Sequence, residues 1–154
     1  MNSAKKLIKQ LDLKPHPEGG HYRRTYLQVE ETASSIYYLL EHGDKSHWHA
    51  IQSDELLFFH CGSPLDVHII SNGKLNTHIM GNNILAGEQA QIVIPANSIL
   101  AMSVTSDQPD SYTLISCVVT PQFKFEEFKL FQAKELLEQF PDIENKIILK
   151  YSIK

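Results

Sequence analysis

The residues with the clearest chemical potential lie in one short stretch, from Ser46 to Glu55. His47 and His49 are two positions apart, so in a strand they would share one face, because successive side chains alternate. Gln52-Ser53-Asp54 is typical of a turn, and Glu55 then opens a second apolar strand. The stretch therefore predicts two imidazoles and a carboxylate that converge inside an antiparallel sheet.

Two histidines and one carboxylate are the ligand set of several metal centres. With open coordination positions, this set is the facial triad of non-haem iron oxygenases, and zinc sites also work with three protein ligands. One interpretation is therefore a metal-dependent enzyme, such as a dioxygenase, in which His47, His49 and Glu55 bind iron, zinc or manganese.

The same residues permit acid–base chemistry without a metal. Histidine has a reference pKa of about 6.5, which suits a general base at neutral pH, and we expect His49 in that role. Asp54 or Glu55 would orient the imidazole and stabilise its charged form, and Tyr22, Tyr38 or His60 would donate to a developing oxyanion. The corresponding reaction is proton abstraction next to a carbonyl, which epimerises or isomerises a sugar-like substrate.

A third interpretation is a ligand-binding module without catalysis. Pro15 to Gly20 holds two prolines and two glycines, and such a loop can fix the position of Glu18. A pocket with aromatic walls and a few convergent polar groups suits a small polar ligand. The expected ligand contacts are polar and aromatic: Glu18, Arg23, Tyr38, Trp48 and Phe59.

Composition and charge narrow the class of protein. The chain has 154 residues, which predicts a single domain over residues 1–154, and a net charge of −4, which argues against a nucleic-acid surface. No apolar run suits a signal peptide or a membrane span, so we expect a cytoplasmic protein without membrane contact. Cys61 and Cys117 lie in apolar settings, which indicates reduced thiols.

The spacing of turn signals predicts the architecture. Roughly nine or ten short strands, with turn residues about every 8–12 positions, indicate an antiparallel sandwich or barrel. Asn72-Gly73 predicts a hairpin in which His68 lies opposite Thr77; His68 and His78 then fall on opposite faces, and both are interpreted as solvated. Short helices are expected near each end, and four phenylalanines between positions 123 and 131 are expected to pack onto the sheet.

At this point the sequence resembles the cupin superfamily. The first cupin motif is matched by Gly43, His47, His49, Glu55 and Gly62, and the outline of the second by Gly87, Pro95 and Asn97. More specifically, the chain is similar to the small cupins called DUF985 or cupin-5. The matching pieces are Leu13-x-Pro-His-Pro-Glu-Gly-Gly20 with Tyr22-Arg23, Ile36-Tyr37-x-Leu-Leu40, Trp48-His49 through Ser53-Asp54-Glu55, Val93-Ile-Pro-Ala96, and Val119-Thr-Pro121 with Phe123 and Phe128.

The resemblance implies an all-β fold, a double-stranded β-helix or jelly-roll barrel with a core of about residues 20–131. It also implies a homodimer, and a sugar-like or nucleobase-like ligand in a fold similar to metal-independent nucleotide-sugar epimerases. Departures from the cupin pattern weaken the prediction of a metal site. Five residues separate His49 from Glu55, where metal-binding cupins usually have fewer, and Leu100 occupies the second motif's histidine position. Asn97 and Gln122 also replace usual glycines.

Overall fold

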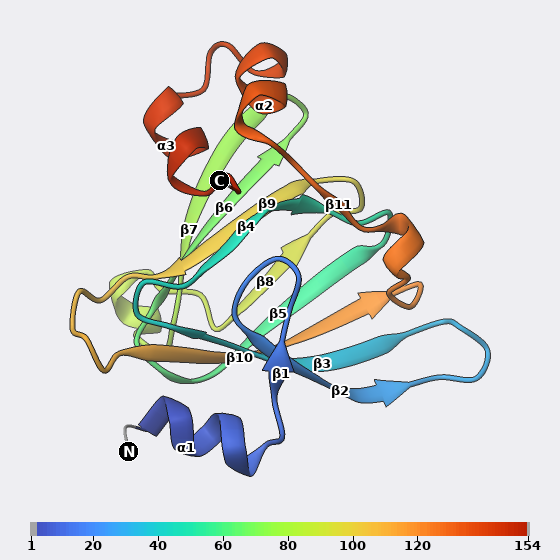
Figure 1. Ribbon diagram of the computed structural model, residues 1–154, viewed down its shortest axis with the longest axis vertical. Coiled ribbons are helices and arrows are strands. Elements are labelled where there is room, and N and C mark those ends of the chain that lie inside the picture. Colours follow the sequence, from blue (N-terminus) through green and yellow to red (C-terminus); the bar gives the residue numbers. More distant parts are fainter. Residues whose placement is uncertain (1–2, 154) are drawn as a thin grey trace.

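Two antiparallel β-sheets face one another in the computed structural model, which describes residues 3–153 (Figure 1). The strand order of the first sheet is β1-β2-β3-β10-β5-β8. These strands are β1 (Lys14–Pro15), β2 (His21–Leu27), β3 (Ser34–Glu41), β10 (Tyr112–Thr120), β5 (Asp54–Gly62) and β8 (Gln91–Ile94).

The second sheet has the order β11-β4-β9-β6-β7. Its strands are β11 (Lys129–Leu130), β4 (Lys45–Ala50), β9 (Ile99–Val104), β6 (Leu65–Ser71) and β7 (Lys74–Met80). Strands that are neighbours in space are mostly distant in sequence, as β3, β10 and β5 are. This confirms the expected jelly roll, a double-sheet arrangement in which each strand pair is antiparallel.

The main core lies between the sheets because each strand turns alternate apolar side chains inward. Leu40 and Leu57 come from the first sheet and Val67, Leu100 and Met102 from the second, and all are at most 1% exposed. Full burial of one such side chain contributes about 1.5–3 kcal/mol.

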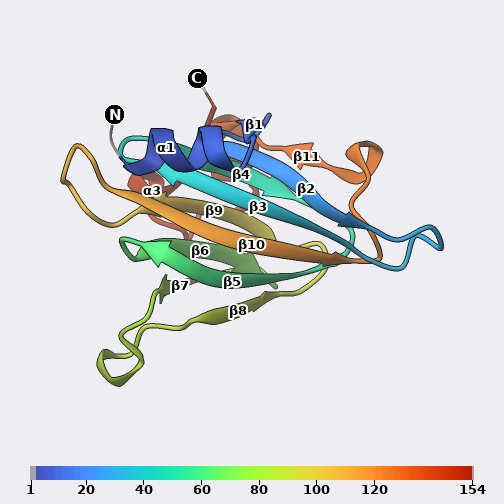
Figure 2. The ribbon, with the colours of Figure 1, turned by 90° about the horizontal axis from the view of Figure 1, so that it is seen from below.

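Helices cover the outer faces of both sheets. α1 (Ser3–Gln10) lies against β3 (Figure 2), with Ala4 buried on Leu39. α2 (Ala133–Gln139) and α3 (Asn145–Lys150) pack on the second sheet, and Trp48 is fully buried beneath them. Short 3₁₀ turns occur at Ile84–Ala86 and Phe125–Glu127. The helices expected at each end of the chain are thus confirmed.

The β6–β7 hairpin has the register that Asn72-Gly73 predicts. Ser71 pairs with Lys74, and His68 lies opposite Thr77. The expectation that His68 is solvated was wrong. Its ring is buried between Thr77 Oγ1 at 2.9 Å and the Tyr151 hydroxyl at 3.0 Å, because the C-terminal segment covers this side of the sheet.

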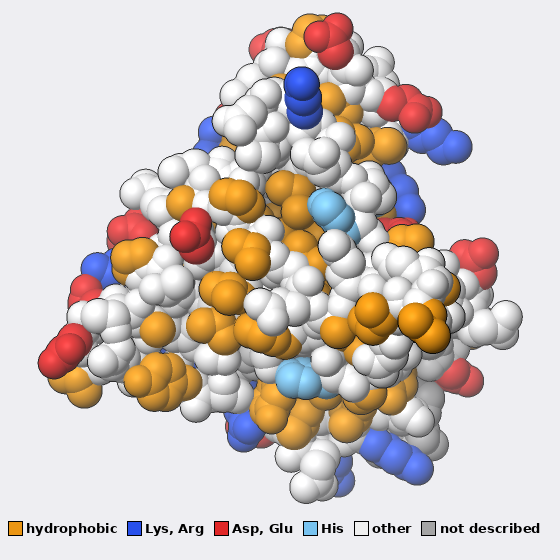
Figure 3. Space-filling view, turned by 180° about the vertical axis from the view of Figure 1, so that it is seen from behind, with side chains coloured by type: hydrophobic (Ala, Val, Ile, Leu, Met, Phe, Trp, Pro, Cys, Tyr) orange, Lys and Arg blue, Asp and Glu red, His pale blue; other side chains and the backbone are white. Residues whose placement is uncertain are grey.

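The molecular surface mixes apolar and charged side chains. On the face opposite to that of Figure 1, apolar groups occupy the middle and charged groups lie mostly toward the edge, without a basic patch (Figure 3). Both cysteines are free thiols. Over residues 3–153, no helix has the length and apolar character required to traverse a lipid bilayer.

Candidate functional site

A pocket opens into the barrel between β2, β4, β5 and β10. With its open mouth it encloses about 540 Å³. Polar and titratable groups share its lining with apolar ones: His16, Glu18, Tyr22, Arg24, Ser34, Ile36, His49, Ile51, Glu55, Cys117, Val119, Phe123 and Phe128. His49 and Glu55 therefore do line one pocket, together with Glu18.

The loop from Pro15 to Gly20 places Glu18 in the pocket. The loop closes through hydrogen bonds from His16 N to Gly20 O and from Gly19 N to His16 O, both 3.0 Å. It docks on β4, where His47 N donates to Glu18 O at 2.8 Å. Gly19 has a φ of +110°, and a Cβ there would lie 1.9 Å from the carbonyl oxygen of Lys45. Only glycine fits at position 19, so this residue permits the close approach of the loop to β4.

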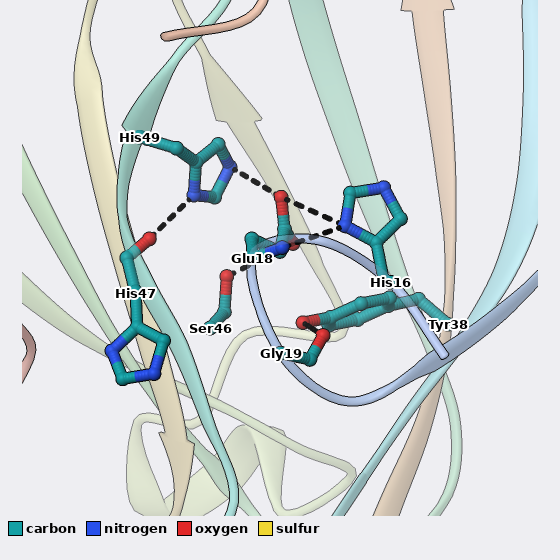
Figure 4. Close-up of polar contacts among 7 residues, drawn as sticks. All are labelled: His16, Glu18, Gly19, Tyr38, Ser46, His47 and His49. Carbon is teal, nitrogen blue, oxygen red and sulfur yellow. Dashed lines mark hydrogen bonds and ion pairs between the residues drawn. The ribbon is translucent and has the colours of Figure 1, made fainter. Parts of the chain in front are cut away.

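A buried ion pair joins the loop to β4 (Figure 4). His49 Nε2 lies 3.2 Å from Glu18 Oε2, and both side chains are less than a tenth exposed. The other ring nitrogen of His49 donates to the carbonyl of His47 at 2.8 Å, which fixes the ring. Ser46 Oγ donates to the second oxygen of Glu18 at 3.0 Å. Because a carbonyl only accepts, Nδ1 carries a proton, and Nε2 is the ring nitrogen that faces the carboxylate of Glu18.

His16 lies on the other side of Glu18. Its Nδ1 accepts a hydrogen bond from Glu18 N at 3.2 Å and lies 3.6 Å from Glu18 Oε2. A nitrogen that accepts carries no proton, so the remaining proton is on Nε2. Burial lowers the pKa of His16, which also favours the neutral ring. His16 is therefore a neutral donor in the pocket lining.

Glu55 is the second carboxyl group of the pocket. Burial raises its pKa from 4.5 to about 7, partly offset by the nearby His49 and reinforced by the charge of Glu18. Cys117, its neighbour on β10, has a pKa well above the usual range, again because of burial. Near neutral pH, Glu55 thus exchanges a proton readily while Cys117 remains a thiol.

Aromatic rings form one wall of the pocket. Phe128 lies over His49 with ring centroids 5.6 Å apart, and Phe123 and Phe125 pack edge-on against each other at 4.9 Å. His16 contacts all three phenylalanines. The segment after Pro121, expected mainly to pack onto the sheet, therefore also lines the pocket.

The structure does not bring His47 to this pocket, so the prediction that His47 and His49 share a face was wrong. The pairing of β4 with β9 is irregular between Ser46 and His49, which breaks the alternation of side chains. Ser46 and His49 face Glu18, whereas His47 points away and its Nδ1 donates to the Tyr151 carbonyl (Figure 4). Trp48, expected against a ligand, instead donates from Nε1 to Ile148 O at 3.0 Å beneath α3.

Four other predicted residues lie outside the pocket lining. Asp54 is exposed on the outer side of β5 and accepts the Ala96 N–H at 2.8 Å, since adjacent strand residues face opposite ways. Arg23 is exposed over Tyr37 for the same reason, and its neighbour Arg24 lines the pocket instead. The remaining two pack elsewhere in the barrel interior: Phe59, against the main core, and Tyr38, whose hydroxyl donates to Gly19 O at 2.7 Å beneath the loop.

The predicted metal triad does not fit this arrangement, because His47 lies away from His49 and Glu55. Within residues 3–153, the side chains of the pocket offer no three ligand atoms that all lie within 4.8 Å of one another. We therefore derive no reaction step through a metal ion in the pocket.

Several residues that line the pocket were not predicted as site residues from the sequence: His16, Arg24, Ser34, Cys117, Phe123 and Phe128. His16 had a usable signal, because it lies inside the same proline- and glycine-rich loop as Glu18. The sequence carries no such signal for Cys117, because an apolar strand with one cysteine is typical of any buried core.

Solved structures of other proteins have the same fold as this chain. The structure resembles a solved protein of Shewanella oneidensis (TM-score 0.89, 34% identity, 99% of this chain and 98% of that chain). It also resembles a hypothetical protein from Leishmania major (TM-score 0.89, 30% identity, 99% and 100%). A variant of Bacillus subtilis oxalate decarboxylase shares the fold (TM-score 0.60, 12% identity, 92% and 38%). No curated protein matches the chain.

The sequence also matches the model of one family, described as the cupin superfamily (DUF985), over residues 5–131. The match includes the loop of Glu18, both strands that supply His49 and Glu55, and the aromatic wall. The resemblance found from the motifs is thereby confirmed, and the chain belongs to the Cupin_5 family of the cupin superfamily.

Proposed function

We propose that this cupin binds a small, polar, sugar-like molecule in the pocket and catalyses a metal-independent isomerisation or epimerisation. The observation that supports this function is the pairing of two unlike acid–base groups in one cavity. His49 Nε2 lies 3.2 Å from the carboxylate of Glu18, while burial raises the pKa of Glu55 to about 7. A histidine and a carboxyl group whose pKa lies near neutral pH are the residue types typical of acid–base catalysis.

Each residue has one role in the proposed reaction. Glu55, as carboxylate, takes the proton from a carbon next to the substrate carbonyl, and the electron pair of that C–H bond moves toward the carbonyl oxygen. His49 donates a hydrogen bond or proton to that oxygen, which stabilises the enolate. Return of the proton to the opposite face of the same carbon gives the epimer. Its delivery to the former carbonyl carbon, while the neighbouring hydroxyl gives up its proton to His49 and becomes the new carbonyl, gives the isomer, and neither route needs an external reductant or oxidant.

Two observations reverse the role first expected for His49. Its Nδ1 is committed to the His47 carbonyl, and its Nε2 faces the carboxylate of Glu18. Both ring nitrogens thus face acceptors and suit a hydrogen-bond donor, so we assign the base to another group of the pocket. Glu55 is the candidate because it lacks a paired cation as close as that of Glu18.

Deuterium exchange tests the proposal. The protein is incubated in D₂O with a panel of ketoses and ketose phosphates, and exchange at carbon is followed by NMR. Exchange with at least one member is expected, and His49→Gln should slow it about a hundredfold, within the usual range for a general acid or base. His60→Gln, an exposed histidine bonded to Ser116 on the outer surface, is the control. Exchange by the wild type that survives His49→Gln unchanged would contradict the assignment.

We also propose a homodimer, formed through the free edges of the two sheets. β7 and β8 end the strand orders, and their apolar side chains are unusually exposed: Ile79 is 47% and Val93 54% exposed, beside Leu85 at 103%. Unpaired apolar edges favour association. Light scattering should give twice the chain mass for the wild type and for Leu149→Lys on α3, and the single-chain mass for Val93→Lys. A monomeric wild type would refute the dimer.

A further inference from the structure

A second group of possible ligands lies outside the pocket, on the outer side of the first sheet. One ligand atom each from His21, Glu41 and Asp44 lie within 4.8 Å of one another, and all three residues are partly buried. None of the three lines the pocket of Glu18 and His49. The site is therefore separate from the proposed catalytic groups.

The fold brings these residues together from three segments. His21 begins β2 and pairs with Leu39, so Glu41 lies two residues further along β3 on the same face. Asp44 follows in the turn before β4, where its Oδ2 accepts the Glu41 N–H at 3.1 Å and its own N donates to Glu41 O at 3.0 Å. The backbone of the turn thus fixes the position of the Asp44 carboxylate.

The imidazole of His21 has an unusual environment. Its Nδ1 is inaccessible to solvent and has no hydrogen-bond partner among the described residues. A buried polar nitrogen left unsatisfied costs about 1–3 kcal/mol, and an unsatisfied group in a folded protein calls for an ion, a water or a functional role. Glu41 and Asp44 place two carboxylates beside this ring. Two carboxylates this close repel each other unless a cation lies between them.

We propose that His21, Glu41 and Asp44 bind a divalent transition-metal ion, of which zinc is the best match. An imidazole ligand favours zinc and its neighbours over calcium and magnesium, which prefer oxygen ligands alone. Three protein ligands with one position left for water form a known zinc arrangement.

A metal ion bound at this site would link two segments that position residues of the pocket. His21 directly follows Gly20, at the end of the loop that holds Glu18, and Asp44 directly precedes Lys45, whose carbonyl lies against Gly19. A metal ion across these segments holds the loop against the start of β4. Zinc should therefore raise the melting temperature of the protein, because a ligand that binds only the folded state stabilises it.

Calorimetric titration of the chelator-treated full chain with ZnCl₂, without a histidine tag, tests the proposal. The wild type is expected to bind one equivalent of zinc, and CoCl₂ should give visible absorption bands from the nitrogen–oxygen ligand set. His21→Ala and Glu41→Gln should each weaken zinc binding at least about tenfold, since even changes around a ligand have that effect. Glu41→Gln keeps the side-chain volume, so it remains informative if His21→Ala folds poorly.

Two control variants give the result its meaning. His42→Ala changes the adjacent exposed histidine, and His49→Ala removes the histidine of the pocket; both should bind zinc as the wild type does. Absence of zinc binding by the wild type would overturn the proposal. Binding that survives both His21→Ala and Glu41→Gln, or that disappears in His49→Ala, would overturn it as well.

Discussion

Glu55→Gln is expected to abolish the exchange activity and, at alkaline pH, to make the protein more stable. Glutamine has nearly the same shape as glutamate but cannot take up a proton, so the substrate C–H bond loses its base. The expected loss is about a thousandfold, inside the range of general acid–base contributions. A gain in stability together with a loss of activity is the trade-off expected of a buried catalytic group.

The gain in stability follows from the raised pKa of Glu55. Below its unfolded-state pKa of 4.5, both states hold the proton, and Glu55 has no effect on the pH dependence. Between 4.5 and about 7, the folded state keeps the proton while the unfolded state loses it, so the free energy of unfolding falls as pH rises. Above about 7 the loss is complete. A shift of this size corresponds to about 3 kcal/mol at most.

Denaturant unfolding at pH 4 and pH 8 measures this effect. Glu55→Gln should match the wild type at pH 4 and exceed it at pH 8 by up to about 3 kcal/mol. Asp54→Asn is the matched control, because it changes the adjacent carboxylate on the exposed side of the strand, where Asp54 accepts the Ala96 N–H. Equal stability of Glu55→Gln and wild type at both pH values would show that Glu55 is an ordinary ionised carboxylate.

The fold could be predicted because its determinants are local and repeated. Asn72-Gly73 specifies a two-residue turn, and that turn fixes the register of β6 and β7 residue by residue. Alternation along β5 likewise predicts that Glu55 and Asp54 lie on opposite faces; the structure buries Glu55 and exposes Asp54, which had been expected beside His49. Such rules need no knowledge of distant segments, and so they hold from the sequence alone.

The site depends on contacts that local patterns do not contain. The irregular pairing in β4 turns His47 away from His49, and an irregularity of one residue cannot be read from the order of side chains. Trp48 is buried because α3 lies over it, far along the chain. The partner of His49 is Glu18, about thirty positions away, rather than the carboxylates next to it in sequence. Spacing thus indicated the right strands but the wrong partners.

Glu18→Gln is expected to destabilise the protein by about 3 kcal/mol, because removal of one partner from a buried ion pair leaves the other charge uncompensated. Glutamine retains the volume and can still accept the Ser46 hydroxyl, so the loss reports the charge opposite His49. Glu31→Gln removes an ion pair with Lys124 whose side chains are 58% and 40% exposed. That control should cost less than about 1 kcal/mol, as surface pairs do.

The same substitution should also shift the pH profile of the exchange reaction. The negative charge of Glu18 is one cause of the raised pKa of Glu55, so its removal should lower that pKa. Glu55 must be ionised to act as a base, and activity therefore rises with pH through about 7 in the wild type. In Glu18→Gln the residual activity should rise at a lower pH, even though its maximum is smaller. A rise at unchanged pH would mean that Glu55 is not the base whose ionisation limits the reaction, because a purely structural defect reduces the rate without moving the profile.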